Sequence, residues 1–213
     1  FKTLIHEVAK NNNLSVQKTQ KDFLDKIIGN KNHQGIIVEA KILSKKNPDD
    51  LENILNVHKD SKPIYLILDS IQDPHNLGAC IRTSVAAGVS AIIIPKDRAV
   101  QVNETVKKVA CGAAENISIV TVVNLVRALK KMKELGIWII GTAGDAKESI
   151  YNLDLKIPIA IVIGGESTGI RSQVLKECDF IGSLPINEKI ESLNASVATG
   201  IVLYEVVRQR MSR

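Results

Sequence analysis

Two residues between Asp69 and Thr83 are of types that bind anions and hydroxyl groups. Asn76 and Arg82 stand six residues apart in a stretch with helical periodicity, so they can face one pocket within about two turns of a helix. A carboxamide both donates and accepts hydrogen bonds, and a guanidinium binds phosphate through paired donors. The same spacing also fits an ordinary N-cap at Asn76 followed by a surface arginine in a salt bridge.

A glycine-rich loop between Gly164 and Gly169 has the spacing of a catalytic turn. Its Gly-Glu-Ser-Thr-Gly run, residues 165–169, matches the nucleophile elbow of serine hydrolases. In those enzymes the catalytic histidine follows the serine in the chain. All four histidines here precede Ser167: His6, His33, His58 and His75. The order of residues therefore argues against a hydrolase of this type.

The same loop also lacks the residues of two nucleotide-binding motifs. Gly164 and Gly169 have the spacing of a phosphate loop, but Ile170 and Arg171 follow where Lys and Ser or Thr are required. The dinucleotide fingerprint GxGxxG does not occur in the chain. We interpret the loop as a turn whose backbone a ligand can approach closely.

The segment from Glu191 to Gly200 is rich in small polar side chains and precedes the last helical pattern. Ser192, Asn194 and Ser196 fall within five positions, although one helix N-cap needs only one such residue. The others are free to bind a ligand.

Short β-branched runs alternate with helical patterns after Pro63 and must position these three segments. Strands are expected at Ile64–Leu68, Ala91–Ile94, Ile117–Val120, Ile137–Ile140, Ile159–Ile163 and Phe180–Leu184. Helices are expected at Leu77–Ala87, Glu104–Cys111, Val122–Leu135, Arg171–Glu177 and Ala195–Arg210. This alternation predicts an α/β domain, a parallel sheet covered by helices. Ligands of such sheets bind at the carboxyl ends of the strands, here after Leu68, Ile140, Ile163 and Leu184.

The first 42 or so residues predict a separate small α+β unit. Helices are expected at Thr3–Ala9 and Thr19–Ile28, and short apolar segments at Leu14–Val16 and Ile36–Glu39. The unit is rich in Lys and Asn, as in Lys31, Asn32, His33 and Gln34, which suits contacts with phosphates and base edges or simply solvated loops. The polar stretch Ser44–Pro48 is the expected linker.

Composition indicates a globular protein. Hydrophobic residues make up 45% and charged residues 24% of 213 residues, and the longest apolar stretch, Ile157–Gly165, is too short to span a bilayer. A net charge of +5 fits a nucleic-acid partner without requiring one, and 3% aromatic residues leave no stacking platform for single strands. Three cysteines without a CxxC pair predict buried free thiols in a cytoplasmic protein, and we expect no signal peptide.

Asp69–Thr83, Ile163–Ile170 and Ser192–Gly200 together resemble, in order and spacing, the three motifs of the SpoU (TrmH) family of RNA ribose 2′-O-methyltransferases. The runs Ile71–Ala79 and His33–Gly35 are most similar to the branch that modifies a guanosine of large-subunit ribosomal RNA. The resemblance implies three parts. Residues 1–43 would form a ribosomal-protein-like RNA-binding domain that is shortened at its start. Residues 44–60 would form a linker with a first helix, and residues 61–213 the methyltransferase domain.

The resemblance also implies a fold, a cofactor and partners. The C-terminal segment is expected to thread a loop as a trefoil knot (the SPOUT-type α/β knot), and the protein to be a homodimer that uses S-adenosylmethionine, without a metal. Arg82 is expected to activate the ribose hydroxyl or to clamp a phosphate, with Asn76, Ser192 and Asn194 in the same pocket. RNA contacts are assigned to Arg82, Lys31, Asn32, His33 and Gln34. Cofactor contacts are assigned to Gly141, Thr142, Ala143, Gly164, Gly165, Glu166, Leu184, Ile186, Leu193, Asn194 and Ser196.

One detail and two alternatives accompany this interpretation. Glu166 is expected to organise the pocket by accepting hydrogen bonds from backbone amides. Transfer RNA is the alternative substrate, and a non-catalytic RNA-binding or ribosome-assembly protein of the same fold is the alternative function.

Overall fold

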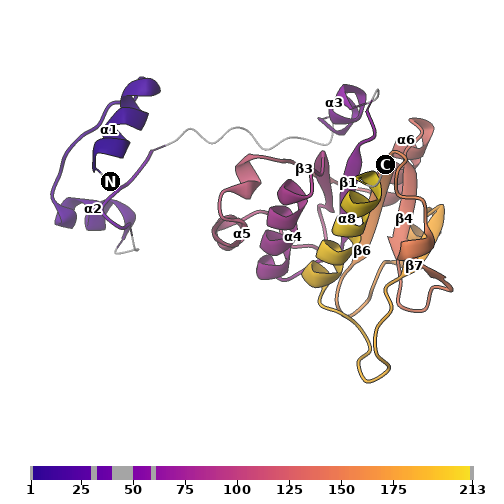
Figure 1. Cartoon of the computed structure of the whole chain (residues 1–213). Helices are drawn as coiled ribbons and strands as arrows, with labels where there is room; N and C mark the ends of the chain where they lie inside the picture. Colours follow the sequence, from indigo (N-terminus) through magenta and orange to yellow (C-terminus); the bar gives the residue numbers. More distant parts are fainter. Residues whose placement is uncertain (1, 30–32, 40–49, 59–60, 212–213) are drawn as a thin grey trace. The chain divides into compact units, whose positions relative to one another are not determined.

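The structure, a computed structural model, describes residues 2–29, 33–39, 50–58 and 61–211. The chain divides into two compact units, Phe1–Ser44 and Lys45–Arg213, which are described separately (Figure 1). The predicted linker Ser44–Pro48 lies outside the described residues.

The N-terminal unit contains two helices, α1 (Lys2–Asn11) and α2 (Lys21–Ile28). Helix α2 ends at Gly29, whose φ of 63° is the left-handed conformation that favours glycine and whose N–H bonds to the carbonyl of Asp25. Both expected helices are found. The apolar segments 14–16 and 36–39 form no strand within the described part of the unit, because neither has a hydrogen-bonded ladder partner there. Of the predicted α+β unit, the described residues thus show the two helices.

The second unit is built on a seven-stranded sheet in which every pairing is parallel. Its strands are β1 (Ile64–Asp69), β2 (Ala91–Pro95), β3 (Ser118–Val122), β4 (Trp138–Thr142), β5 (Glu148–Ser149), β6 (Ile159–Gly164) and β7 (Phe180–Ser183). Their order across the sheet is β3-β2-β1-β6-β4-β7-β5. All six predicted strands are present. Strand β5 escaped prediction because two residues are too few to show periodicity.

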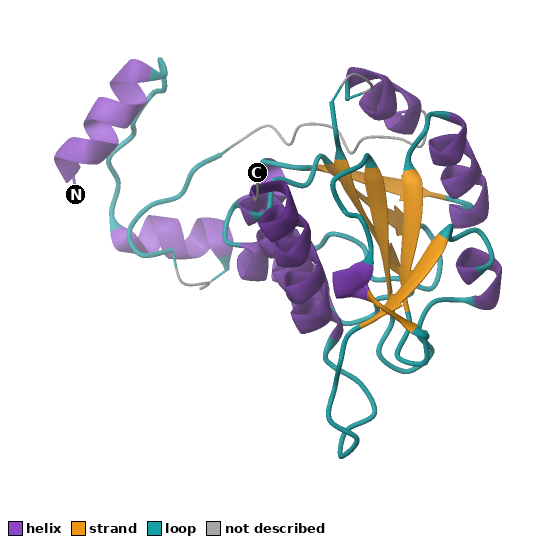
Figure 2. Ribbon diagram, turned by 45° about the vertical axis from the view of Figure 1, so that its right-hand side comes forward, coloured by secondary structure: helices purple, strands orange, loops and turns teal. Residues whose placement is uncertain are grey.

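Helices cover both faces of the sheet (Figure 2). They are α3 (Asp50–Val57), α4 (Pro74–Ala86), α5 (Glu104–Ala110), α6 (Leu125–Glu134), α7 (Ser172–Leu175) and α8 (Ala195–Met211), with short 3₁₀ turns at η1 (Ala113–Glu115) and η2 (Ile150–Asn152). The predicted α/β class is confirmed. Helix α6 begins three residues later than expected, because Val122 still belongs to β3 and Asn124 caps the helix.

Strand β1 shows why the core has two layers. All six of its residues are buried, and successive side chains point to opposite faces. Leu66 and Leu68 belong to the cluster that includes residues of α4, α5 and α8. Tyr65 and Ile67 belong to the cluster that includes residues of α3 and α6. A continuous apolar run is thus the sequence signature of a strand covered on both faces.

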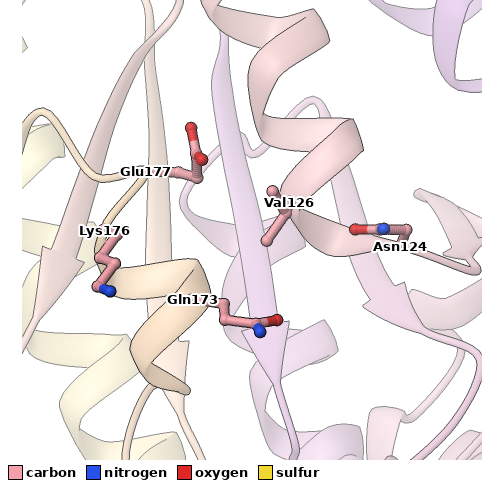
Figure 3. Close-up of a pocket in the computed structure, with 5 residues that line it drawn as sticks. All are labelled: Asn124, Val126, Gln173, Lys176 and Glu177. Atoms are coloured by element: carbon pink, nitrogen blue, oxygen red, sulfur yellow. The ribbon is translucent and has the colours of Figure 1, made fainter.

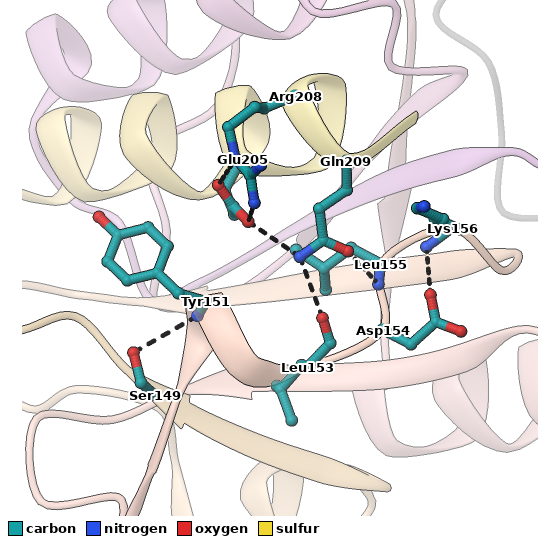
Figure 4. A network of polar contacts seen from close by, with 9 residues as sticks. All are labelled: Ser149, Tyr151, Leu153, Asp154, Leu155, Lys156, Glu205, Arg208 and Gln209. Atoms are coloured by element: carbon teal, nitrogen blue, oxygen red, sulfur yellow. Dashed lines mark hydrogen bonds and ion pairs between the residues drawn. The ribbon is translucent and has the colours of Figure 1, made fainter. Parts of the chain in front are cut away.

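The last turns of α8 are fixed to the segment that leads into β6 (Figure 4). Gln209 donates to the carbonyl of Leu153 at 3.1 Å and accepts from the Leu155 N–H at 3.0 Å. Arg210 donates to the carbonyls of Leu155 and Ile157. Helix α8 therefore returns from the loop after β7 and is fastened at its far end, while the knotted threading of this segment stays a prediction of the family resemblance.

Candidate active site

A chain of three polar side chains joins the three predicted motif segments. Asn194 donates from Nδ2 to Oδ1 of Asn76 at 2.9 Å, and Asn76 donates from Nδ2 to Oε1 of Glu166. These residues come from the start of α8, the first turn of α4 and the loop after β6. Side chains 90 and 118 residues apart in sequence are thus in direct contact at the carboxyl edge of the sheet.

The N-cap of α8 fixes the direction of both hydrogen bonds that link Asn194, Asn76 and Glu166. Oδ1 of Asn194 accepts from the backbone N–H of Ser196 at 2.9 Å and from its hydroxyl at 2.6 Å. The Nδ2 group of Asn194 is therefore left to donate to Asn76, whose own Nδ2 then faces Glu166. The expectation of an N-cap at Asn194 agrees with this geometry, and the same residue also reaches the site.

Asn76 is placed by a helix start that differs from the expected one. Asp73 caps α4 by accepting from the His75 N–H at 2.9 Å, and Pro74 occupies the first turn, where its fixed φ and missing N–H are tolerated. The helix therefore begins at Pro74 and not at Leu77, and Asn76 is not its cap. Asn76 is only 9% exposed, and its amide is free for Glu166 and Asn194.

The glycine loop is folded back on itself. Gly165 and Gly169 form an antiparallel bridge, and the Gly169 N–H donates to the Gly165 carbonyl at 2.9 Å. A Cβ at Gly164 would lie 2.1 Å from the backbone of Gly169, and one at Gly165 would lie 2.5 Å from the carbonyl of Ser70. These glycines are needed for contact between backbones. We expected the glycines to let a ligand approach the backbone closely. Contact between segments of the protein backbone is a further reason for them.

Glu166 lies at the exposed tip of this loop, and its recorded partner is the Asn76 side chain. We expected Glu166 to accept hydrogen bonds from backbone amides, and the structure shows it accepting from the Asn76 side chain instead. This side-chain contact couples the loop to α4.

Arg82 is exposed and lies about 1.7 turns beyond Asn76 on α4. Its Nη1 donates to Sγ of Cys111 at 3.5 Å, so its guanidinium lies toward the end of α5. Gly78 allows α4 and α5 to pack this closely, since a Cβ at Gly78 would lie 2.7 Å from Cβ of Val109. In the described part of the chain Arg82 forms no ion pair, so the salt bridge in our alternative reading is not found and the charge is available to an anion.

The three cysteines differ in exposure. Burial raises the pKa of the Cys80 thiol to about 11 and that of the Cys178 thiol to about 12. Cys111, at the end of α5, is exposed. The expectation of buried thiols therefore holds for Cys80, is met in part by the half-buried Cys178, and fails for Cys111, which ends α5 in the left-handed conformation (φ 51°).

The residues assigned to the cofactor follow three neighbouring strands, β6, β4 and β7. The Ala143 N–H bonds to the Gly182 carbonyl at 3.2 Å, and the Thr142 hydroxyl bonds to the Val162 carbonyl at 3.0 Å. The carboxyl end of β4 is thus held to both of its neighbours, β6 and β7. Gly141 is a packing residue, since a Cβ there would lie 2.8 Å from Sγ of Cys178.

Half-buried aliphatic side chains and open backbone adjoin these loops. Seven residues in or next to these loops are partly exposed: Thr142, Ala143, Gly164, Leu184, Ile186, Leu193 and Ser196. Apolar walls with backbone donors and acceptors suit a nucleoside, which presents a flat apolar base with polar edges. Ser192 is exposed two residues before Asn194.

The residues assigned to RNA lie in the N-terminal unit, where Lys31 and Asn32 are outside the described residues. The His33 side chain is only 4% exposed and lies 3.1 Å from Asp25 Oδ1 through its Nε2. Its Nδ1 accepts from the Gly35 N–H at 2.8 Å, so Nε2 carries the proton that it donates to Asp25. His33 thus shapes the loop, and the exposed neighbour is Gln34.

A hollow of about 280 Å³ lies elsewhere on the unit, between α6 and α7 (Figure 3). Its lining includes Asn124, which caps α6 by accepting from Arg127 N–H, and Glu177, which pairs with Lys130 at 3.6 Å. These polar groups already serve local structure, and no motif residue lines the hollow. We therefore place the site at the Asn194–Asn76–Glu166 chain.

Metal and membrane features were sought in the same described ranges. No group of three or more His, Cys, Asp or Glu side chains there is arranged to hold a metal ion. Among the helices of residues 2–29, 33–39, 50–58 and 61–211, none has both the length and the apolar character needed to cross a bilayer.

A parallel sheet with a glycine loop and oriented amides at its carboxyl edge defines an α/β domain with a ligand site at that edge. The sequence model of the SpoU rRNA Methylase family matches residues 63–204. A second model, described as RNA 2′-O ribose methyltransferase substrate binding, matches residues 1–45. The chain belongs to the SpoU rRNA methylase family.

Named relatives match most of the chain. A protein of Vibrio parahaemolyticus named 23S rRNA (guanosine-2′-O-)-methyltransferase RlmB is 46% identical over 199 residues, which cover 93% of this chain and 80% of the relative. The protein of the same name from Pseudomonas aeruginosa is 48% identical over 178 residues, covering 84% of this chain and 71% of the relative.

Solved structures share the fold. The SpoU methyltransferase AviRb from Streptomyces viridochromogenes, in complex with the cofactor AdoMet, has a TM-score of 0.67 and 26% identity, covering 71% of this chain and 59% of that one. An AdoMet-bound rRNA methyltransferase from Sinorhizobium meliloti has a TM-score of 0.67 and 26% identity, covering 75% of this chain and 61% of that one. The chain thus spans about three-fifths of the length of these solved structures.

The contact between Asn76 and Glu166 can be tested by charge. Asn76→Asp replaces the donor with a second, nearly buried carboxylate facing Glu166, and we expect it to lower the free energy of unfolding by about 1–3 kcal/mol. Glu166→Gln in the same chain should restore most of the loss, as measured by urea denaturation. Asn152→Asp is the matched control, because Asn152 donates to Glu148 at 2.7 Å in an exposed pair. Equal losses in both single variants would contradict the geometry.

Proposed function

We propose that this chain transfers the methyl group of S-adenosylmethionine to a ribose 2′-hydroxyl of RNA, at a guanosine of 23S-type ribosomal RNA. The observation that carries the proposal is the identity of 46% over 93% of the chain with a relative of that name. The direct contact of Asn76, Glu166 and Asn194 supports it, because the three motif segments then form one site. A ribosomal substrate is found in the cytoplasm, where we expect the protein to act.

The residues at the carboxyl edge fit S-adenosylmethionine. The residues that would hold it lie at the ends of three strands and at the start of α8. They are Gly141, Thr142 and Ala143 at the end of β4, Gly164, Gly165 and Glu166 at the end of β6, Leu184 and Ile186 after β7, and Leu193, Asn194 and Ser196 before and within α8. When bound, it supplies an electrophilic methyl group on a sulfonium. Half-buried Leu184 and Leu193 would exclude water from the adenosine, and backbone groups of the three loops would fix its polar edges.

The chain's own task is to align the ribose hydroxyl. Such alignment lowers a barrier by about 7–11 kcal/mol. The exposed guanidinium of Arg82 can clamp the adjacent phosphate with paired donors and stabilise the alkoxide that develops as the hydroxyl loses its proton. Arginine side chains have pKa values of about 12 or higher, so we assign Arg82 to the clamp in preference to the base.

Asn76, Asn194 and Ser192 hold the other side of the same pocket. Asn194 fixes the start of α8 relative to Asn76, and Asn76 fixes the glycine loop through Glu166. Ser192, exposed two residues before Asn194, is available to the ribose or its phosphate.

We also propose that the N-terminal unit binds the RNA. The match of residues 1–45 to a substrate-binding family supports this role. Gln34 is an exposed residue beside the internally bonded His33, and we assign it to contacts with base edges or phosphates. Lys31 and Asn32 precede it in the sequence and are proposed to contribute donors.

A homodimer is the proposed working state. Helix α8 exposes Val197, Tyr204 and Met211 at 49%, 52% and 77%. Residues seven apart lie on one side of a helix, so these three form an apolar stripe on the face turned away from the core. A second copy of this chain, supplying the same stripe, would cover it.

Replacement of Arg82 tests the proposed reaction. Arg82→Ala should reduce transfer of labelled methyl from S-adenosylmethionine to unmodified large-subunit ribosomal RNA by about 100-fold or more, because both phosphate binding and alkoxide stabilisation are lost. Arg82→Lys keeps the charge without the paired donors and should retain part of the activity. Arg127→Ala, an exposed arginine on α6, is the control.

The outcomes of that assay separate the rival functions. Label on transfer RNA alone would replace the proposed substrate. An inactive chain that binds no S-adenosylmethionine would favour a non-catalytic RNA-binding protein. A wholly inactive Arg82→Lys at raised pH would argue against the clamp.

Replacement of Tyr204 tests the dimer. Light scattering after size exclusion should give about twice the 23.3 kDa of one chain for the wild type. Tyr204→Glu should shift this mass to the monomer, because it places a charge in the middle of the apolar stripe. Tyr151→Glu, which alters another exposed tyrosine (43%), should leave the mass unchanged, and a monomeric wild type would contradict the proposal.

A further inference from the structure

We infer that Asp69 is a positioning residue for cofactor binding, because its ion pair with Arg171 fixes both ends of the glycine loop. The inference rests on the proposed function, which assigns this loop to S-adenosylmethionine. In the sequence Asp69 is simply the first residue after an apolar run. The structure shows it to be fully buried (0% exposed).

Asp69 receives donors from the residue that leaves the loop. The Arg171 N–H donates to Oδ2 of Asp69 at 2.9 Å, and Nε of Arg171 donates to Oδ1 at 2.7 Å. The Ser70 hydroxyl adds a third bond at 3.2 Å. A buried carboxylate that accepts three hydrogen bonds, one from a cation, is well satisfied, so the exit of the loop is held at a fixed place.

Asp69 also lies opposite the residue that enters the loop. It pairs with Gly164 in the β1–β6 register, and the next residue of the loop, Gly165, packs against the Ser70 carbonyl so closely that a Cβ would lie 2.5 Å from it. Entry and exit are thus both defined relative to the end of β1. The bridge between Gly165 and Gly169 then closes the loop, leaving Glu166 at its tip to meet Asn76.

A fully buried carboxylate does not reach a ligand itself, so its effect must pass through the loop. A loop that is not held in its binding conformation must be ordered when the ligand binds, and the cost of that ordering lowers affinity. Loss of the pair would leave the strand ladder intact but would free Arg171 and the loop it ends. Cofactor affinity should therefore fall more than the stability of the sheet.

A matched control separates positioning from stability. Asp179 likewise accepts a backbone N–H, that of Ile139 at 2.8 Å, and pairs with a cation, Lys133 at 3.0 Å. It precedes β7, at the amino end of the sheet and away from the proposed site. Asp179→Asn therefore removes the same kind of contact without disturbing the glycine loop.

The experiment compares Asp69→Asn, Asp179→Asn and wild type in the full chain by calorimetric titration with S-adenosylmethionine. We expect the Kd of Asp69→Asn to rise by about tenfold or more and that of Asp179→Asn to stay within about twofold. In the absence of cofactor, amide exchange of residues 165–170 should accelerate in Asp69→Asn alone. Wild-type affinity together with unchanged exchange in Asp69→Asn would overturn the inference.

Two further outcomes are distinguishable. If Asp69→Asn does not fold, Arg171→Gln tests the same pair, because it removes the cation while keeping the backbone donor. It should give a smaller rise in Kd and in the rate of amide exchange. No change in either quantity would overturn the inference. If wild type binds no S-adenosylmethionine, the proposed function fails, and the exchange measurement still decides whether Asp69 positions the loop.

Discussion

Asn76 makes the contact on which the site depends, since it lies between a donor from α8 and an acceptor from the loop after β6. The Asn76 carboxamide can accept from Asn194 and donate to Glu166 in one orientation only, and the N-cap at Asn194 selects that orientation. The buried position of Asn76 makes an unsatisfied amide costly, by about 1–3 kcal/mol. Three loops that are distant in sequence are therefore held in one arrangement before any ligand arrives.

The sheet supplies the rigid base for this arrangement. Strands β1 and β6 are neighbours in the centre of the sheet and are buried on both faces. Their carboxyl ends carry Asp69 and Gly164, which are register partners. A loop held at both ends by such strands needs glycines where backbones touch, and the close contacts of Gly164 and Gly165 show this requirement. Preorganisation of this kind reduces the entropy lost when a ligand binds.

Much of this architecture was predictable from the sequence, for physical reasons that can be named. The apolar run of β1 and its five counterparts marked six of the seven strands. The signal is strongest in β1, β2 and β6, because a strand buried on both faces must be apolar throughout. The starts of α4 and α6 were misplaced, because caps at Asp73 and Asn124 depend on which polar residue the tertiary structure leaves to the helix. The two-residue β5 is too short for any pattern.

The site was predictable in its residue types and not in its contacts. Small polar residues before α8 and after β1 indicated a pocket, but nothing local shows that Asn76 faces Glu166 or that Arg82 faces Cys111. Asp69 and Arg171 were overlooked, although an acidic residue that ends an apolar strand was a usable signal, because burying a charge requires a partner. His33 was assigned to RNA from the polar composition of its segment and from the family resemblance, and neither could show that both of its ring nitrogens are bonded within the unit.

A crystal structure of the protein with S-adenosylhomocysteine, the product of methyl transfer, tests the central claim most directly. The account predicts that the adenosine lies at the carboxyl edge of β6, β4 and β7, against Gly164, Leu184 and Leu193, while the Asn194–Asn76–Glu166 chain is unchanged. Binding in the hollow between α6 and α7, or binding that breaks the contact between Asn76 and Glu166, would contradict it.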